Sequence, residues 1–416
     1  MFDFHKEGKR FQDKCTGCGV CASVCPIIPM TEIRDMDSAK IMESVMALCH
    51  DKTPSPEARS RIYSCMSCQT CRPHCPEGLD PGLGLSLARG ILREMGDPVP
   101  RGLSFLLPET DFNFMKAIEA VQIKPADRPW STDVDRQKPG PSKTVLFTGC
   151  TGLMQPDLVR TALALLRIID PTAQALGGVD YCCGDTNLRA GNPDASTAHF
   201  LRLVDALNVF NPEDVVFLCP TCKAFFDLHA PRTAWSWRFV TDFLAEHVDK
   251  LGPFAERKAT VTIHDACHLV RGEVPESESP RKLLGAIPGV QIIEMKKSGK
   301  DGHCCGGSAM AAVGKPGADF RNQRLQEATG TGAEIMAIYC PGCQSVFAPE
   351  RPNLSIKVES ILVLLGQSLG ISHEDRLLRY SAYRDGERVL LEAGECIEAS
   401  ELPREKLEKF LTKYFK

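Results

Sequence analysis

The chain carries twenty cysteines, and eighteen of them fall into short, repeated motifs. Cysteine thiolate is a soft ligand that binds zinc, copper(I) and iron–sulfur clusters. Disulfide frameworks are typical of short secreted chains, whereas this chain has 416 residues and begins with the polar stretch MFDFHKEGKRF, which lacks the pattern of a secretory signal. Closely spaced cysteines in repeated runs therefore indicate metal or cluster ligation.

Two copies of one four-cysteine run lie near the N-terminus. They contain Cys15, Cys18, Cys21 and Cys25 before Pro26, and Cys65, Cys68, Cys71 and Cys75 before Pro76. The spacing C-x₂-C-x₂-C-x₃-C-P is that of two-cluster bacterial ferredoxins, in which the fourth cysteine ligates the other cluster. We therefore expect one [4Fe–4S] cubane on Cys15, Cys18, Cys21 and Cys75, and the other on Cys65, Cys68, Cys71 and Cys25. A zinc knuckle is the alternative, and evenly spaced cysteines followed by proline fit it poorly.

The other ten motif cysteines form two sets that repeat at a period of about 120 residues. CCG set 1 is Cys150, Cys182, Cys183, Cys219 and Cys222, and CCG set 2 is Cys267, Cys304, Cys305, Cys340 and Cys343. Each set has one thiolate more than a cubane needs, and its adjacent pair suits neighbouring irons of a larger or opened cluster. Gly184 and Gly306 follow the pairs, and we expect them to let the backbone approach the sulfides without a Cβ. Structural zinc on four of the five thiolates, or a vicinal disulfide, is the alternative.

Strand-like runs precede the cysteines of both CCG sets, and helix-like segments follow them. TVLF and VTIH come before Cys150 and Cys267, and VVFL and MAIY come before Cys219 and Cys340. Alternating strand and helix signals predict two α/β halves with parallel sheets, and ligands of such sheets bind beyond the carboxyl ends of the strands. We therefore predict an α+β multidomain protein, with an N-terminal α-helical ferredoxin-like domain for two [4Fe–4S] clusters followed by two pseudo-repeated α/β CCG domains.

The predicted boundaries follow these motifs and the composition between them. Residues 1–124 form the ferredoxin-like domain, residues 125–142 a linker rich in proline and charge, residues 143–255 and 256–369 the two CCG domains, and residues 370–416 a C-terminal extension. We expect a small strand pair and a terminal amphipathic helix in the extension, and we assign it no chemistry.

The paired CCG motifs joined to a ferredoxin pair resemble the D subunit of heterodisulfide reductase, or equally a fusion of its C and B subunits, over roughly residues 10–365. In disulfide-reducing members of that superfamily, each five-cysteine set holds a noncubane [4Fe–4S] cluster, and the disulfide is cleaved between the two clusters. The resemblance thus implies a noncubane cluster on each CCG set, with zinc as the alternative at one of them. The superfamily also contains iron–sulfur subunits of anaerobic glycerol-3-phosphate dehydrogenase, glycolate oxidase and class II benzoyl-CoA reductase complexes, so the architecture does not choose the reaction.

The resemblance implies an iron–sulfur subunit of a multi-subunit oxidoreductase. Electrons would come from a flavoprotein (similar to the A subunit of heterodisulfide reductase, or a dehydrogenase) or from a cytochrome b partner, and would pass through the cubanes to the CCG clusters. These clusters would reduce a small disulfide; the alternative is a pure electron relay without substrate chemistry. The sequence contains no G-x-G-x-x-G and no P-loop, so we expect any flavin or nicotinamide on another polypeptide of the complex.

Disulfide reduction consumes two protons, so proton donors are expected beside the clusters. His264, His268 and His303 flank Cys267 and Cys304 in the sequence, and we predict this role for them. Hydrogen bonding to cluster sulfur is the alternative for each histidine.

The charge and the hydropathy of the sequence argue against a nucleic-acid-binding protein and against a membrane-spanning protein. The net charge of −4, without a basic run interleaved with aromatic residues, gives no indication of nucleic-acid binding. No apolar run reaches the length of about 18 residues that a membrane span requires. We expect a cytoplasmic protein that associates with a membrane, if at all, through a partner protein. Cys49 and Cys396 stand outside every motif, and we assign them no role.

Overall fold

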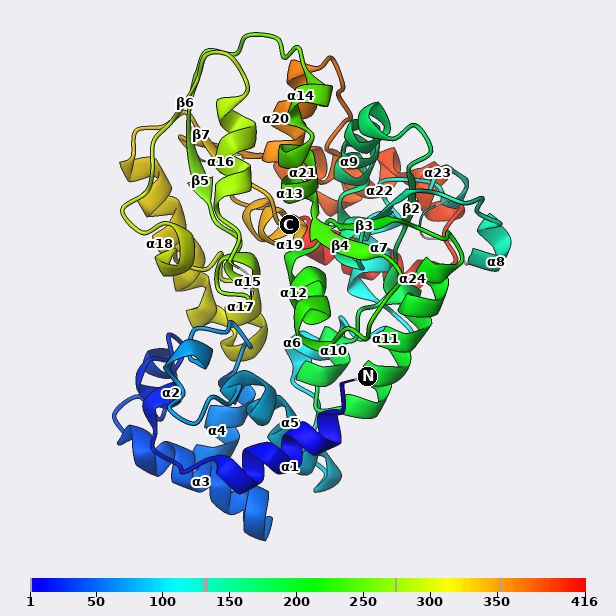
Figure 1. Cartoon of the computed structure of the whole chain (residues 1–416). Coiled ribbons are helices and arrows are strands. Elements are labelled where there is room, and N and C mark those ends of the chain that lie inside the picture. The colour runs from blue at the N-terminus through cyan, green and yellow to red at the C-terminus, as the bar shows by residue number, and fades with distance from the viewer. Residues whose placement is uncertain (1, 129, 131–133, 274, 352–353) are drawn as a thin grey trace.

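Two four-stranded sheets with the same strand order form the centre of the molecule (Figure 1). The computed structural model describes residues 2–128, 130, 134–273, 275–351 and 354–416. The first sheet has the order β2 (Gln174–Leu176), β1 (Thr144–Phe147), β3 (Asp214–Phe217), β4 (Ser236–Phe239), and the second has the order β6 (Val290–Ile292), β5 (Ala259–His264), β7 (Ile335–Ile338), β8 (Lys357–Ser360). All neighbouring strands are parallel. The predicted duplication of a parallel α/β unit is therefore confirmed.

Local signals mark where the strands and helices of these units begin. Strands β1 and β7 are buried at every position, as parallel strands covered on both faces are. Four helices begin with a proline, which fixes φ and lacks the N–H that the first turn leaves unpaired: α9 (Pro156–Ile169), α11 (Pro193–Asn208), α12 (Pro220–His229) and α19 (Pro341–Phe347). The other helices of eight or more residues in the sheet units are α16 (Glu278–Gly285), α18 (Ala318–Gly330) and α20 (Ile361–Ser368).

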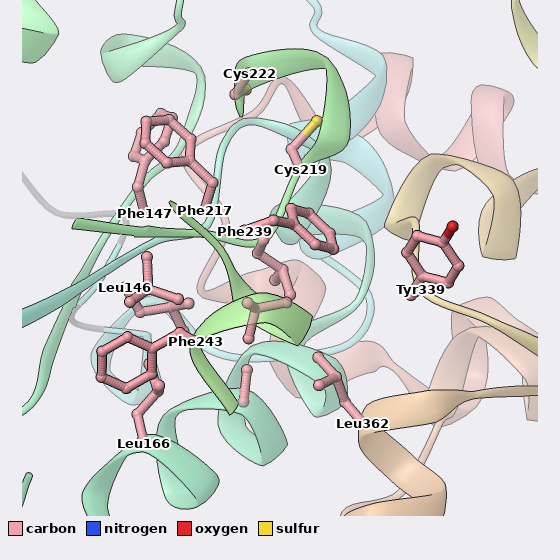
Figure 2. Close-up of a cluster of buried hydrophobic side chains, with 14 of the residues drawn as sticks. Leu146, Phe147, Leu166, Phe217, Cys219, Cys222, Phe239, Phe243, Tyr339 and Leu362 are labelled. Atoms are coloured by element: carbon pink, nitrogen blue, oxygen red, sulfur yellow. The ribbon is translucent and has the colours of Figure 1, made fainter. Parts of the chain in front are cut away.

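The two sheet units share one hydrophobic core (Figure 2). Phe147 of β1 and Phe217 of β3 pack edge to face with ring centroids 5.4 Å apart. Phe239 of the first unit lies 6.1 Å from Tyr339 of the second, and Leu362 of α20 belongs to the same cluster. Because the core is continuous, the two units are held in one fixed relation rather than joined by a flexible segment.

The central strands place the CCG cysteines at one edge of each sheet. From β1 the chain first adds β2 on one side and then β3 on the other, so the order of connection reverses between β1 and β3, and likewise between β5 and β7. Cys150 and Cys219 lie just beyond the carboxyl ends of β1 and β3, and Cys267 and Cys340 lie just beyond those of β5 and β7. Such reversal points are where open α/β sheets bind ligands.

The N-terminal unit is helical and holds both ferredoxin motifs. Its main helices are α1 (Phe4–Lys14), α3 (Ser38–Asp51), α4 (Pro56–Ser64) and α5 (Pro81–Glu94), with one turn, α2 (Val20–Ser23), inside the first motif. The side chains of Asp37, Ser55 and Asp80 accept hydrogen bonds from the first backbone N–H groups of α3, α4 and α5, which satisfies otherwise unpaired donors. Cysteines of both motifs contribute to the core of this unit.

The C-terminal extension differs from the prediction. The expected strand pair is wrong, because the segment forms four helices: α21 (Arg376–Tyr383), α22 (Gly386–Glu392), α23 (Gly394–Glu398) and α24 (Arg404–Tyr414). The buried residues Leu377 and Tyr380 follow a helical period, and Asp375 and Asp385 cap the first two helices. The extension packs on α7 (Phe114–Glu119), so the predicted ferredoxin-like domain of residues 1–124 ends in a segment that belongs to another core.

Part of the predicted linker is packed against the first sheet unit. Trp130 is buried, and its carbonyl accepts a hydrogen bond of 2.7 Å from the N–H of Gly177. Positions 129 and 131–133 of the linker lie outside the described residues. Across the described part of the chain, no helix combines the length and apolar character needed to cross a membrane.

The contact between α22 and α24 gives a test of the extension. A Cβ added to Gly386 would lie 2.4 Å from Cα of Thr412 in α24, whereas a Cβ on Gly394 meets nothing within 4 Å. Gly386→Ala should therefore lower stability by about 1–3 kcal/mol through overpacking. Gly394→Ala should leave stability unchanged or raise it by up to about 1 kcal/mol. Thermal unfolding followed by circular dichroism measures both, and equal Tm values for the two variants would contradict this packing.

Candidate iron–sulfur sites

The five sulfurs of each CCG set lie in one connected group. In set 1, thiol–thiol hydrogen bonds link Cys150 to Cys182, Cys182 to Cys183, Cys183 to Cys222 and Cys222 to Cys219. In set 2 the same order recurs: Cys267 to Cys304, Cys304 to Cys305, Cys305 to Cys343 and Cys343 to Cys340. The duplication thus extends from strand order to the order in which the sulfurs meet.

Hydrogen bonds between neighbouring thiols lower the pKa of Cys182, Cys219 and Cys305 and so favour the thiolate form of these three, which is the form that ligates metals. Hydrogen bonds and burial raise the pKa of six other thiols of the two sets: Cys150, Cys183, Cys222, Cys267, Cys304 and Cys343. A hydrogen bond from Cys222 lowers the pKa of Cys219 to about 7, and one from Cys304 is the largest cause that lowers the pKa of Cys305 to about 6. Five sulfurs linked in one group fit an iron–sulfur cluster, because several irons can share the group. Burial also raises the pKa of Cys49, which lies outside the motifs, to about 11.

The glycines after the cysteine pairs act differently from the prediction. Gly184 and Gly306 have positive φ values of 96° and 87°, a backbone conformation that side chains disfavour. Their N–H groups donate to Cys182 Sγ and Cys304 Sγ at 3.4 and 3.3 Å. An added Cβ would meet Ser196 at 2.5 Å and Gly317 at 2.9 Å, so neighbouring chain segments, rather than the sulfur side, exclude a side chain.

One cavity of about 320 Å³ is lined by all ten cysteines of the two CCG sets. Its wall also contains Leu103 and Phe114 from the segment after the ferredoxin motifs, and Tyr414 from α24. The C-terminal extension, for which the sequence predicted no chemistry, therefore contributes to this cavity. Because the thiols that would hold both clusters line this cavity, the clusters themselves would occupy part of it.

The ferredoxin cysteines gather in two crossed groups. One cavity is lined by Cys15, Cys18, Cys21 and Cys75, which we call the outer ferredoxin site. A second is lined by Cys25, Cys65, Cys68 and Cys71, which we call the inner ferredoxin site. These are the two sets predicted to share a cubane each; ligation by each individual thiolate stays a prediction.

The two ferredoxin loops have matching backbones despite different residues. Gly17 and Gly19 of the first loop have φ values of 70° and 79°, and Ser67 and Gln69 occupy the corresponding positions of the second with φ values of 51° and 61°. A left-handed backbone costs a residue with a side chain roughly 1–2 kcal/mol. Its presence at two non-glycine positions shows that the surrounding contacts impose the loop conformation.

Three of the largest fully buried side chains are arginines near the cysteine sites, and sequence reasoning missed them: Arg61, Arg89 and Arg324. Arg61 Nη1 donates to Cys25 Sγ at 3.6 Å; burial opposes its charge, but Cys25 and Cys65 hold the pKa of Arg61 above its usual value. Arg89 donates to the carbonyls of Ile62 and Cys65. A buried cation is costly unless it is paired, and an anionic cluster would supply that pairing. Arg61 stands one helical turn before Cys65, a spacing that could have identified it.

The three predicted histidines have three different environments. His264 is buried; its Nδ1 accepts from Arg324 Nε at 2.9 Å, so its Nε2 carries the proton and donates to Cys343 Sγ at 3.4 Å. Burial, assisted by Arg324, lowers the pKa of His264 to about 3. The ligand atoms of His264, Cys305 and Cys343 lie within 4.8 Å of one another. His264 is therefore placed as a neutral hydrogen-bond donor to a CCG set 2 sulfur.

His268 and His303 are placed apart from each other. His268 lines the cavity between the CCG sets. His303 Nδ1 lies 2.6 Å from Glu327 Oε1, and His303 is not among the residues that line that cavity. Proton donation by the three histidines stays a prediction.

Two family models match this chain at the positions of these sites. The Cysteine-rich domain (CCG) matches residues 144–227 and 261–348, and the 4Fe-4S dicluster domain matches residues 12–79. The chain belongs to the CCG-domain iron–sulfur proteins. It carries cubane clusters in its dicluster domain and iron–sulfur clusters at its CCG domains.

Curated relatives of this CCG-domain protein are iron–sulfur subunits of oxidoreductases. The D subunit of dihydromethanophenazine:CoB–CoM heterodisulfide reductase from Methanosarcina acetivorans is 26% identical over 394 residues, covering 87% of this chain and 95% of the relative. The B subunit of fumarate reductase (CoM/CoB) from Methanothermobacter marburgensis is 28% identical over 84% of this chain and 71% of its own length. A probable glycolate oxidase iron-sulfur subunit from Bacillus subtilis is 24% identical, with coverages of 83% and 91%. An electron-transfer role in an oxidoreductase complex is therefore supported.

The glycine after the second cysteine pair provides a test of the CCG sites. Gly306→Ala should reduce the iron bound at CCG set 2, because the side chain strains the backbone and displaces the N–H that donates to Cys304. Gly332→Ala is the matched control, since Gly332 also has a positive φ, of 73°, but a Cβ there meets nothing within 4 Å. The control substitution should lower the stability of the protein only by the backbone strain, which is roughly 1–2 kcal/mol, and should leave the iron content unchanged. Iron analysis of the folded variants compares them, and equal iron content would contradict this account.

The crossed ferredoxin sites predict a remote effect of one substitution. Cys25→Ser should alter the spectrum of the cluster that Cys65, Cys68 and Cys71 hold, because Cys25 lines the inner site although it belongs to the first motif. EPR of the reduced protein measures both cubanes. A changed outer cluster beside an unchanged inner cluster would show that the crossed assignment is wrong.

Proposed function

We propose that this chain is the iron–sulfur subunit of a multi-subunit oxidoreductase in which electrons from a flavin- or haem-containing partner pass through two cubanes to noncubane clusters at the CCG sets, where a small disulfide is reduced. The observation that carries the proposal is that both complete five-cysteine sets line one cavity of about 320 Å³, so that clusters held by them would occupy part of this space and face each other across the rest. A pure relay needs no space for a substrate between its clusters. A reductase needs such a space, and the relatives that bear the name heterodisulfide reductase share this architecture along most of the chain.

The arrangement of the sites supports a direction for the path. Cys18 of the outer ferredoxin site is exposed, so a partner protein can approach this cluster. Cys25 and Cys68 of the inner ferredoxin site pack in one hydrophobic cluster with Cys304, Cys305 and Cys343 of CCG set 2. In the proposed path, electrons pass from the partner protein to the outer ferredoxin site, then to the inner ferredoxin site and CCG set 2, and finally reach the cavity.

The residues of this chain would bind and orient the disulfide and supply exchangeable protons. Reduction of R–S–S–R′ takes up two electrons and two protons, breaks the S–S bond and releases RSH and R′SH. When bound, the clusters supply these electrons singly. Polar side chains in the cavity wall include Arg189, Ser345 and Tyr414, and they can orient a substrate within mainly apolar surroundings. Leu103 and Phe114 add apolar side chains to the same wall.

Thiol-dependent EPR of the oxidised protein tests the proposal. Protein with its full complement of about sixteen irons per chain is treated with 2-mercaptoethanol, and we expect a new paramagnetic signal with g values distinct from those of the cubanes. Ethylene glycol, which has no thiol, should produce none.

Two buried cysteines provide matched variants for this test. Cys183→Ser should abolish the thiol-dependent signal, because Cys183 belongs to CCG set 1. Cys49→Ser should leave it unchanged, because Cys49 is buried outside the motifs. A wild-type protein with full iron and no thiol-dependent signal would instead be a relay, and stoichiometric zinc would overturn the four-cluster assignment.

A further inference from the structure

One imidazole contacts the loops of three proposed clusters. His268 follows Cys267 of CCG set 2 directly and is buried at the start of the second sheet unit. Its Nδ1 lies 2.7 Å from Oγ1 of Thr221, which stands between Cys219 and Cys222 of CCG set 1. Its Nε2 lies 3.2 Å from the carbonyl oxygen of Ser67, which stands between Cys65 and Cys68 of the second ferredoxin loop.

The partners of His268 determine where its proton lies. The Ser67 carbonyl can only accept, so Nε2 carries the proton and donates it. Nδ1 forms the hydrogen bond with the Thr221 hydroxyl. Both ring nitrogens are thus engaged with cluster loops, which makes the ring a connector between them rather than a free acid in the cavity.

Further contacts between the same two segments hold this junction together. Arg271, one turn after His268, donates from Nη1 to Thr70 Oγ1 at 3.2 Å and from Nη2 to the Gly302 carbonyl at 2.6 Å. Thr70 Oγ1 in turn lies 3.3 Å from Cys68 Sγ. Arg72 forms an ion pair with Glu273 at the rim. The segment from Cys267 to Glu273 therefore docks on the second ferredoxin loop through the side chains of His268, Arg271 and Glu273.

The backbone of the ferredoxin loop is shaped for this contact. Ser67 has a φ of 51°, which costs free energy for a residue with a Cβ. Its equivalent in the first loop is Gly17, which has no such contact with a sheet unit among the described hydrogen bonds. The strained residue thus occurs in the loop whose carbonyl accepts from His268.

We propose that His268 is a positioning residue that fixes the inner ferredoxin site against both CCG sets and so sets the rate of electron transfer between them. The inference rests on the electron path proposed above. One electron leaves the reduced inner cubane and arrives at the CCG clusters, and no bond is made or broken. The rate of electron tunnelling falls steeply with separation, and a hydrogen-bonded bridge supports tunnelling better than a gap does. The contacts that His268 makes with Thr221 and Ser67 therefore determine the rate of transfer between the clusters.

The experiment measures transfer between clusters without any substrate. The outer and inner cubanes of the intact protein are reduced by a rapid-mixing step, and freeze-quench EPR follows the electron to the CCG clusters. His268→Ala should slow this transfer by roughly tenfold, the low end of what loss of a residue supporting metal ligands costs. Thr221→Val removes only the partner of Nδ1 and should slow it less. His268→Gln, whose amide both donates and accepts, should restore part of the rate.

Two readouts separate positioning from a merely structural role. Iron content and the rate at which the cubanes themselves are reduced should remain at wild-type values in His268→Ala. His247→Ala is the matched control, because His247 also hydrogen-bonds a carbonyl, that of Phe243 at 2.9 Å, but lies at the end of α13 (Val240–Glu246), outside the cysteine motifs. This control should transfer electrons at the wild-type rate.

Wild-type transfer rates in both His268→Ala and Thr221→Val would overturn the proposal. Loss of iron from His268→Ala would overturn it too, unless Thr221→Val retains full iron and shows the slow transfer. A wild-type protein that reduces no disulfide would contradict the proposed function alone, because the transfer between clusters is measured in the absence of a substrate.

Discussion

The packing of ten cysteine sulfurs around one cavity is the constraint on which the rest of this structure depends. Buried thiolates repel one another, and each loses the hydration it would have in water. The protein meets this cost with N–H donors such as those of Gly184 and Gly306, with a neutral His264 that donates to Cys343, and with bound iron. The two parallel sheets are the framework that delivers these groups to the same place, because the carboxyl ends of their central strands carry the cysteine loops.

Buried positive charge is the complement of this constraint in the ferredoxin unit. Arg61 is almost completely buried and donates to Cys25, and Arg89 donates to the carbonyl of Cys65. Without an anionic partner, each guanidinium would be destabilising by several kcal/mol. The burial of Arg61 beside thiol groups is therefore physical support for an anionic cluster there, independent of the cysteine spacing.

The cluster sites are connected to one another by polar contacts rather than by a shared element. The inner ferredoxin site meets the sheet units through His268, Arg271 and the ion pair between Arg72 and Glu273, while the hydrophobic cluster around Cys304 and Cys305 closes the remainder of that interface. Cys18 of the outer site is exposed. In the proposed path, this orientation leaves the outer cluster of the N-terminal helical unit for a partner protein and places the inner cluster toward the CCG cavity.

Local spacing by itself determined the two ferredoxin motifs, the two five-cysteine sets, the duplication and the parallel sheets, because each of these is a pattern of neighbours along the chain. It did not determine the helical extension. The prediction of a strand pair there was wrong, because the short apolar runs of this segment are compatible with the period of a strand and with that of a helix. It also gave no indication that Tyr414 lines the cavity or that His268 reaches Ser67, a residue 201 positions away. Such contacts join segments that are distant in sequence, and the spacing of residues along the chain does not identify which distant residues meet. Only tertiary packing, which closes the sheets, the helical unit and the extension around one cavity, decided which of the predicted residues meet.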